Sequence, residues 1–387
     1  MPEKLKKGWR TWRFDQMAVM VNDRIDNPAE AGVDRYVGLE HLDSDSLTIR
    51  RWGSPSDVEA TKLRFRAGDI IFGRRRAYQR KLGVPTFDGI CSAHAMVLRA
   101  RRDVAAAEFL PFFMQSDLFM ERAKQISVGS LSPTINWKTL AAEEFALPPL
   151  EEQRRIAEVL ALADHFDESL RRLAYAASTA RESWLERELT VLARMAPEKP
   201  ANEVIERITV GIVVKPADLY VAPDQGIPAL RSLNVAPGRL VMEDVVFISK
   251  EGHSEHAKSR LQAGDVVIVR SGRPGDAAVV PGDIGELNCI DLIICGLSPQ
   301  IAPEFLCTVL NSAFGRKQFS SGSAGTAQQH FNVGAFKRFR LPVPALGVQQ
   351  QFVGGLCKMD GGVAQAQART RQSAELRKRL MEKVLLQ

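Results

Sequence analysis

The sequence predicts an α+β protein with two tandem copies of one domain, each followed by a long helix. The main observation is a repeat, because Ala67-Gly68-Asp69 and the apolar run after it return as Ala263-Gly264-Asp265. The same offset of 196 residues relates Glu108 to Glu304, Gly129 to Gly325, Asn136 to Asn332, Leu150 to Leu346, Gln153 to Gln349, Leu160 to Leu356, and Asp164 to Asp360. A solenoid repeat spans only about 20 to 50 residues. The period therefore indicates duplication of a domain together with its connector.

The first part of each copy predicts short strands mixed with a few helices. Runs rich in β-branched residues alternate with turns that contain Gly and Pro, as at 70–72, 246–248, 266–269 and 292–294. A helical patch from 108 to about 126 returns from 304 to about 319. These patterns predict α+β domains at 1–150 and 197–344, each with an antiparallel or mixed sheet.

Long helices are predicted at 151–196 and 345–387. Residues 151–194 contain neither Gly nor Pro and follow Pro148-Pro149. Glu151-Glu152 would lie in the first turn, where acidic side chains suit the helix dipole. The first helix, about 45 residues long, would run about 65 Å. A heptad pattern predicts a seam of Ile156, Ala163, Leu170, Ala177, Trp184 and Val191, together with Val159, Phe166, Leu173 and Ala180.

The second helix is expected to need support from the first. It contains Gly354-Gly355 and Gly361-Gly362, and a glycine in a helix interior costs about 1 kcal/mol relative to alanine. Antiparallel pairing returns the second helix to the first domain, whereas parallel pairing leaves its far end without a domain. We therefore predict two domains separated by two long antiparallel, coiled-coil-like helices, with pseudo-two-fold symmetry.

Composition indicates a soluble cytoplasmic protein. The chain has 387 residues and a formal net charge of +6. Five cysteines without a CxxC pair favour neither a disulfide framework nor a zinc site. No apolar run approaches the roughly 18 residues of a membrane span, and no N-terminal apolar stretch indicates a signal peptide. We expect no contact with a membrane.

The common catalytic motifs are absent from the sequence. There is no GxxxxGK[ST] loop, no GxGxxG turn, no GxSxG elbow, no HExxH helix and no Glu-x-Lys tripeptide. His253 and His256 are three residues apart, but solvated polar side chains explain them better than a metal pair does. We therefore expect no catalytic residue, metal site or cofactor in this chain.

Basic clusters are the first candidates for a binding site. Arg74, Arg75, Arg76, Arg80 and Lys81 follow the predicted strand at 70–72, and in the second copy Arg270 and Arg273 follow the strand at 266–269. Guanidinium groups donate bidentate hydrogen bonds to phosphates and to guanine edges. A solvated charged face is the alternative, but arginines after the same strand in both copies favour DNA binding.

Two polar loops are the second candidates. They begin at Gly129 and Gly325, and each lies between a helical patch and an Asn-led apolar segment. Their polar side chains can donate to and accept from base edges, and the candidates are Ser130, Ser132, Thr134, Thr326, Gln328, Gln329 and His330. A loop that only caps the neighbouring elements is an equal alternative.

Three segments resemble the specificity subunits of Type I restriction–modification systems. Residues 147–157 read Leu-Pro-Pro-Leu-Glu-Glu-Gln-Arg-Arg-Ile-Ala, as at the junction after a target recognition domain in that family. Residues 341–352 are a looser version that lacks the acidic pair, and residues 226–235 resemble the opening of a recognition domain. With the duplication and the helical tails, the resemblance covers essentially the whole chain.

The resemblance implies a non-catalytic DNA reader with two target recognition domains and two spacer helices. Each domain would read one half of a bipartite target, which we expect to be asymmetric because the candidate loops of the two copies differ. The implied partners are double-stranded DNA, two methyltransferase subunits and restriction–translocase subunits. S-adenosylmethionine, ATP and Mg²⁺ would belong to the partner subunits only.

Two other functions remain open on the sequence. A coiled-coil adaptor could bind protein alone, and its long helices would look the same. A DNA-modifying enzyme would carry its own chemistry, which the missing motifs disfavour.

Overall fold

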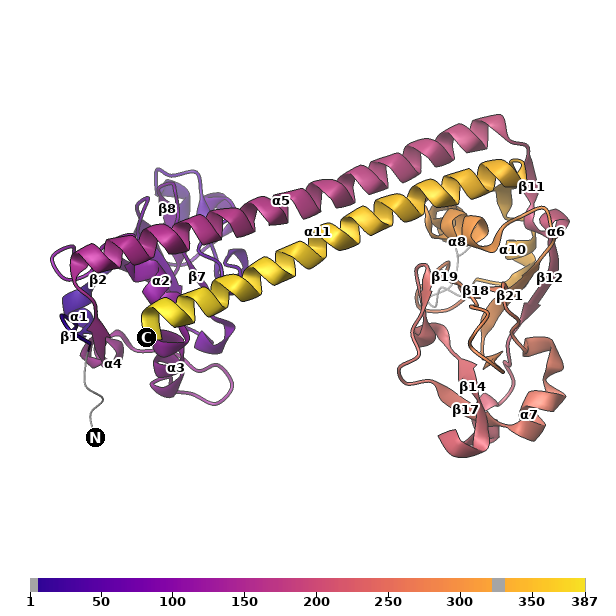
Figure 1. The fold of residues 1–387 in the computed structure, drawn as a ribbon, viewed down its shortest axis with the longest axis horizontal. Coiled ribbons are helices and arrows are strands. Elements are labelled where there is room, and N and C mark those ends of the chain that lie inside the picture. The colour runs from indigo at the N-terminus through magenta and orange to yellow at the C-terminus, as the bar shows by residue number, and fades with distance from the viewer. Residues whose placement is uncertain (1–5, 322–330, 387) are drawn as a thin grey trace. The chain divides into compact units, whose positions relative to one another are not determined.

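The computed structural model describes residues 6–321 and 331–386 (Figure 1). The chain divides into two compact units: unit 1 comprises Met1–Arg172 and Ala368–Gln387, and unit 2 comprises Leu173–Gln367. Each unit therefore combines one α+β domain with part of each long helix. Within the described ranges, no helix has the length and apolarity needed to cross a membrane.

Unit 1 contains two four-stranded sheets. The first has the order β2 (Ala18–Val21), β9 (Ala95–Ala100), β6 (Ile70–Gly73), β7 (Leu82–Gly83). The second has the order β3 (Arg24–Ile25), β5 (Lys62–Phe65), β8 (Gly89–Ser92), β4 (Tyr36–Val37). The other elements are the pair β1 (Arg10–Arg13) and β10 (Glu144–Leu147) and the helices α1 (Phe14–Met17), α2 (Leu110–Gln115), α3 (Asp117–Gln125) and α4 (Trp137–Ala142).

Unit 2 also contains two four-stranded sheets. They have the orders β12 (Ile205–Val210), β21 (Leu292–Leu297), β18 (Val266–Val269), β19 (Ala277–Val279) and β13 (Tyr220–Val221), β17 (Val246–Ser249), β14 (Gly226–Leu230), β20 (Asn288–Cys289). There are also two two-stranded sheets. In one, β11 (Glu198–Pro200) pairs with β22 (Arg340–Pro342), and in the other, β15 (Val235–Ala236) pairs with β16 (Arg239–Leu240). The helices are α6 (Ala201–Val204), α7 (Lys250–Glu255), α8 (Pro303–Asn311), α9 (Ala313–Ser321) and α10 (Val333–Lys337).

The first sheets of the two units correspond strand for strand, but the second sheets do not. In unit 1 the antiparallel pair β3–β5 continues onto β8, whereas in unit 2 the pair β13–β17 continues onto β14. The offset also changes locally. Ile70 pairs with Leu98 in unit 1, whereas Val266 pairs with Cys295 in unit 2. The offset between the copies is therefore 196 residues from β6 to β18 but 197 residues from β9 to β21. The duplication is therefore preserved in the core sheet and has diverged around it.

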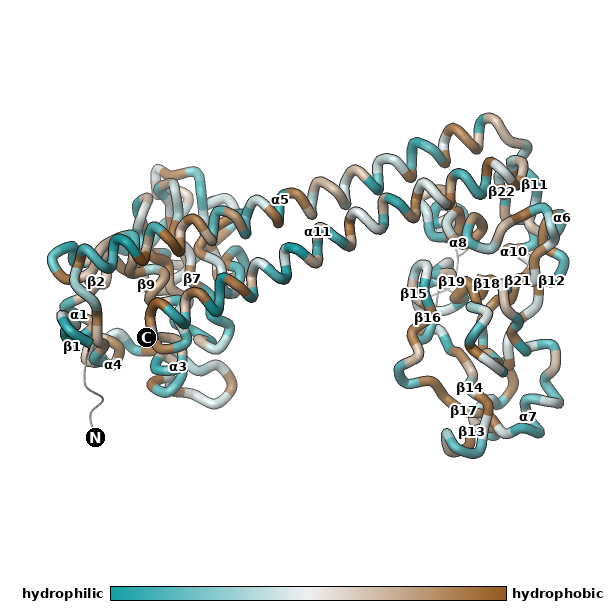
Figure 2. Tube along the Cα trace, viewed as in Figure 1, coloured by the Kyte–Doolittle hydropathy of each residue, from teal (hydrophilic) through white to brown (hydrophobic). Residues whose placement is uncertain are grey.

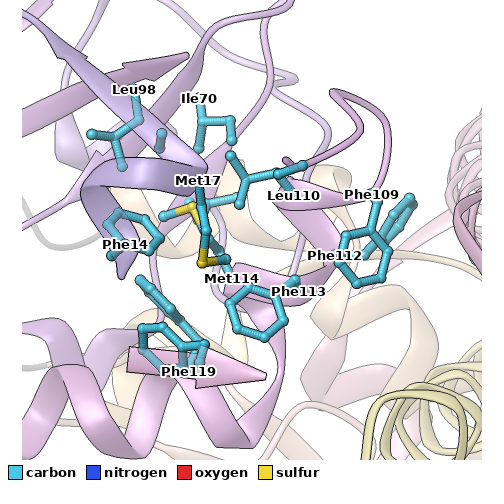
Figure 3. Close-up of a cluster of buried hydrophobic side chains, with 14 of the residues drawn as sticks. Phe14, Met17, Ile70, Leu98, Phe109, Leu110, Phe112, Phe113, Met114 and Phe119 are labelled. Atoms are coloured by element: carbon cyan, nitrogen blue, oxygen red, sulfur yellow. The ribbon is translucent and has the colours of Figure 1, made fainter. Parts of the chain in front are cut away.

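Aromatic side chains fill the core of unit 1 behind its first sheet (Figure 3). The ring centroid of Phe14 lies 5.4 Å from that of Phe119 and 6.1 Å from that of Phe145. Met17 and Phe113 are buried in the same cluster. Burying one such side chain contributes about 1.5–3 kcal/mol, so this cluster gives the domain a core of its own.

The predicted long helices are confirmed as α5 (Leu150–Met195) and α11 (Leu346–Leu386), along which hydrophobic and hydrophilic residues alternate (Figure 2). They are antiparallel inside each unit. In unit 1, Arg377 Nη1 lies 3.1 Å from Asp164 Oδ1, and Met381 packs in a cluster with Ile156 and Leu160. In unit 2, Arg181 Nε lies 2.7 Å from Asp360 Oδ1, and Trp184 stacks on Phe352 with centroids 5.5 Å apart.

The structure corrects the second position of the predicted heptad. Val159, Phe166 and Leu173 are exposed, and Phe166 keeps 60% of its surface accessible. The buried positions of α5 include Leu160 and Asp167, each of which comes one residue after a predicted second-position residue, Val159 or Phe166. In the first predicted position Ile156 and Trp184 do pack as expected, whereas Val191 is exposed. The predicted seam is therefore right only in part.

The paired glycines of α11 differ in their surroundings. A Cβ added to Gly355 would lie 2.9 Å from Trp184 Cζ2, whereas one added to Gly354 would meet nothing within 4 Å. We expect Gly354→Ala to raise the free energy of unfolding by about 0.5–1 kcal/mol, because alanine favours the helix. Gly355→Ala should bring no gain, because the indole ring must move. Urea denaturation of the full chain measures both, and equal stabilisation by the two substitutions would contradict the close packing of Trp184.

Candidate nucleic-acid interface

The loop after β6 brings together two of the predicted sites of unit 1. Arg75 and Arg76 are exposed, and their Nε atoms donate to Ser132 Oγ at 2.7 and 3.3 Å. The backbone N–H of Arg76 also donates to the carbonyl of Pro133 at 2.7 Å. The arginine loop and the loop that begins at Gly129 therefore form one surface, although 57 residues separate Arg75 from Ser132.

A hollow of about 360 Å³ opens beside these arginines. Its lining combines cationic, amide and imidazole groups with a single carboxylate: Leu39, Glu40, Arg75, Arg76, Gln79, Lys81, Ser92 and His94. Lys81 Nζ donates to the Leu39 carbonyl at 2.6 Å, which fixes its ammonium at the wall. Such a lining offers both donors for phosphates and acceptors for base edges.

His94 is a member of this surface that the sequence did not reveal. It lies in the turn between β8 and β9, and its Nε2 is 3.5 Å from Arg75 Nη1. Partial burial lowers the pKa of His94, and the neighbouring cations Arg75, Arg74 and Lys62 lower it further. The ring is therefore neutral at pH 7 and acts as a hydrogen-bonding group.

Arg74 and Arg80 have internal partners. Arg74 Nη2 donates to the Ala93 carbonyl at 3.2 Å. Arg80, whose side chain is only 17% exposed, lies 2.5 Å from Asp45 and 2.8 Å from Asp117. Both arginines hold the loop in shape, which leaves Arg75 and Arg76 as its outward-facing cations.

Arg76 and Arg80 also shape the loop through their backbones. Both adopt left-handed conformations, with φ of 57° and 52°, on either side of the short 3-10 turn Ala77–Gln79. Left-handed φ is uncommon outside glycine and is maintained only by surrounding contacts. The internal bonds of Arg80 supply such contacts.

The corresponding loop of unit 2 is built differently. The carbonyl of Arg270 accepts from Phe331 N at 3.0 Å, as the carbonyl of Arg74 accepts from Ile135 N at 2.9 Å. Arg270 is 8% exposed and pairs with Asp291 at 2.9 Å. Arg273 is exposed and donates to the Val235 carbonyl at 3.3 Å. Its Nε also lies 3.3 Å from Asp276 Oδ2, but 58% of its side chain is exposed, which makes Arg273 the more outward-facing cation of this loop.

The remaining candidates lie in the two polar loops. Ser130 is exposed, and Thr134 Oγ1 donates to the Ser132 carbonyl at 3.2 Å. Thr326, Gln328, Gln329 and His330 lie outside the described residues. Among the described residues, the structure joins the loop that begins at Gly129 to the arginine cluster of unit 1.

The glutamine that recurs at the start of both long helices, Gln153 and Gln349, has the same structural role in the two units. Buried Gln153 accepts from Ala106 N at 2.8 Å and donates to the carbonyls of Val104 and Pro148. Gln349 makes the same three bonds in unit 2, with Ala302 N, Gln300 O and Pro344 O. Each glutamine therefore fastens the start of a long helix to the loop before α2 or α8.

Within the described ranges, no group of three His, Cys, Asp or Glu side chains could hold a metal ion. Burial raises the pKa of the Cys91 and Cys289 thiols far above neutrality, and it raises that of Cys307 to about 11. These thiols are neutral at physiological pH and behave as small apolar side chains.

Residues 55–172 match the sequence profile of the Type I restriction modification DNA specificity domain. The specificity subunit of the Type I restriction enzyme EcoDI from Escherichia coli is 28% identical over 174 residues, which are 43% of this chain and 38% of that subunit. The StySPI specificity subunit from Salmonella potsdam is 27% identical over 196 residues, 49% of this chain and 41% of that subunit. The matched region thus spans about two fifths of these relatives.

A solved chain from a study of complex assembly and conformational transition of the type I R-M system has a TM-score of 0.66. It is 22% identical, and the alignment covers 99% of this chain and 98% of that one. At this identity the likeness establishes the fold. The chain is thus similar to Type I restriction–modification specificity subunits, in sequence over the specificity domain at 55–172 and in fold over nearly its full length.

Proposed function

We propose that the chain is the non-catalytic DNA-reading subunit of a Type I restriction–modification complex. Each unit reads one half of a bipartite target, and methyl transfer and cleavage belong to partner subunits with their own S-adenosylmethionine, ATP and Mg²⁺. The observation that carries this proposal is the surface of unit 1 where Arg75 and Arg76 meet Ser132 beside a hollow lined with polar groups. Phosphate contacts position a protein on DNA, and polar groups at base edges supply specificity.

The two halves of the target are expected to differ. Where unit 1 has Arg75 and Arg76, the same offset of 196 places Ser271 and Gly272 in unit 2. Ser271 Oγ donates to Asp291 at 3.2 Å, so a carboxylate lies near the unit 2 loop. Unit 1 therefore offers more positive charge to phosphates, and unit 2 depends more on polar and apolar contacts.

Partner subunits have a suitable surface on α5. Val159, Leu162 and Phe166 are exposed at spacings of three and four residues, which places them along one face of the helix. Apolar side chains that remain exposed on a helix face are typical of a protein-binding site. We propose that methyltransferase subunits dock here and that restriction–translocase subunits join the complex. An adaptor that binds protein alone would expose the same stripe, so the stripe does not distinguish the two functions.

Binding of the chain, assembled with its methyltransferase partners, to duplexes that contain the methylated motif tests the proposal. Affinity should fall by a factor on the order of 10³ or more between 50 and 200 mM salt if six or more phosphates are contacted. The motif is found by sequencing modified DNA from cells with and without this chain. Assembly without DNA binding would favour the adaptor, and methylation by the chain alone with S-adenosylmethionine would favour an enzyme.

A further inference from the structure

The same short turn occurs beside the arginine loop in both units. In unit 1 the 3-10 turn η2 (Leu39–His41) follows β4, and in unit 2 the turn η7 (Ser232–Asn234) follows β14. Both strands pair in parallel with an equivalent neighbour, since β4 lies on β8 and β14 lies on β20. The two turns therefore occupy the same place in the two domains.

Each turn is closed by the same hydrogen bond. Gly38 N donates to His41 Nδ1 at 3.0 Å, and Arg231 N donates to Asn234 Oδ1 at 2.9 Å. Asn234 is fully buried and also donates to the carbonyls of Val241 and Glu243. The middle residue of each turn, Glu40 or Leu233, is consequently presented to solvent by a fixed backbone.

Glu40 lines the cationic hollow of unit 1, and its carboxylate folds over Gly38, where an added Cβ would clash with Glu40 Oε1. Its side chain is 65% exposed, and its nearest basic group is His41 Nε2 at 4.0 Å. Arg75, Arg76 and Lys81 line the same hollow, yet none of them pairs with Glu40 in the part of the chain that the structure describes. A carboxylate here repels phosphate, so it suits a neutral group that donates hydrogen bonds.

Leu233 takes the equivalent position in unit 2 with the opposite chemistry. It is 71% exposed although its turn is anchored by a buried asparagine. Arg273 reaches the same segment, because its Nη2 donates to the Val235 carbonyl. Leu233 therefore belongs to the segment that Arg273 contacts in unit 2. Its counterpart Glu40 lines the same hollow as Arg75 and Arg76 in unit 1.

We propose that position 40 and its counterpart 233 are base-reading positions in the two half-sites, an inference that rests on the proposed function. Glu40 accepts a hydrogen bond from the N4 amino group of a cytosine in the major groove. Adenine is disfavoured, because its N7 acceptor lies beside its amino group and would face the second carboxylate oxygen. Leu233 contacts the 5-methyl group of a thymine, the apolar feature of that groove.

The test uses the full chain assembled with its methyltransferase partners and reads the methylated motif base by base. Glu40→Ala should lower the preference for cytosine at one position of one half-site by about tenfold or more. Glu40→Gln should shift that position toward adenine, because an amide both accepts and donates. Leu233→Ala should remove a preference for thymine in the other half-site, whereas Leu233→Met should keep it.

Controls separate this inference from the proposed function. Glu30→Gln changes an exposed carboxylate that does not line the hollow and should leave every base preference intact. Assembly of each variant with its partners shows that it is folded. A wild-type motif that stays unchanged in the Glu40 and Leu233 variants would overturn the inference, and so would relaxation at bases other than cytosine and thymine. A wild-type complex without a bipartite motif would instead overturn the proposed function.

Discussion

Replacing Arg75 and Arg76 together with alanine is expected to abolish recognition of one half-site while leaving unit 1 folded. Both side chains are exposed, and their guanidinium groups donate to Ser132 of the neighbouring loop. Loss of two DNA contacts should weaken binding on the order of a hundredfold. If both contact phosphates, the slope of log affinity against log salt should become shallower by about two. Fluorescence anisotropy of the assembled complex at several salt concentrations measures both effects.

Arg80→Ala is the matched comparison, since it removes the same charge from the same loop. Arg80 is held by Asp45, Asp117 and the Gln115 carbonyl, so its loss should destabilise unit 1. The salt dependence of DNA binding should change little. An Arg75/Arg76 variant that binds the full target normally would refute the assignment of this loop to DNA contact.

Gln153→Ala and Gln349→Ala are each expected to lower the free energy of unfolding by about 3–5 kcal/mol, since each leaves buried backbone groups without partners. In unit 1 these groups are the Ala106 N–H and the carbonyls of Val104 and Pro148. The N-terminus of α5 would then lose its attachment to the loop before α2. Urea denaturation followed by circular dichroism measures the loss.

Exposed glutamines provide the control for these two substitutions. Gln125 in unit 1 and Gln225 in unit 2 are exposed, so their replacement by alanine should change stability by less than about 0.5 kcal/mol. Equal effects at the buried and the exposed positions would show that the three-bond attachment contributes little to stability.

The repeat and the long helices could be predicted because each leaves a regular pattern in the sequence. Turn chemistry and strand composition likewise indicate the α+β domains. The diverged second sheets could not be predicted, since the pairing of β17 with β14 rather than with β20 depends on contacts between distant segments. Ion pairs such as Arg377 with Asp164 also escape an analysis that counts only apolar residues, and this is why the second heptad position was wrong.

The candidate interface was only partly predictable for a similar reason. The arginine cluster identified the loop, but charge alone did not separate Arg75 and Arg76 from the internally bonded Arg80. Glu40 and His94 are 54 residues apart in the sequence, yet both line the hollow beside Arg75. Strand pairing brings them to one hollow, and no local motif records that pairing.

The sharing of α11 between the units has a consequence for how the protein is made. Residues 368–386 complete unit 1, where Arg377 meets Asp164 and Met381 joins the core cluster. A ribosome synthesises these residues long after the first domain has emerged. Unit 1 must therefore wait with an incomplete surface on α5 while unit 2 is being translated. It is completed only when the segment 368–386 closes onto the first-made domain.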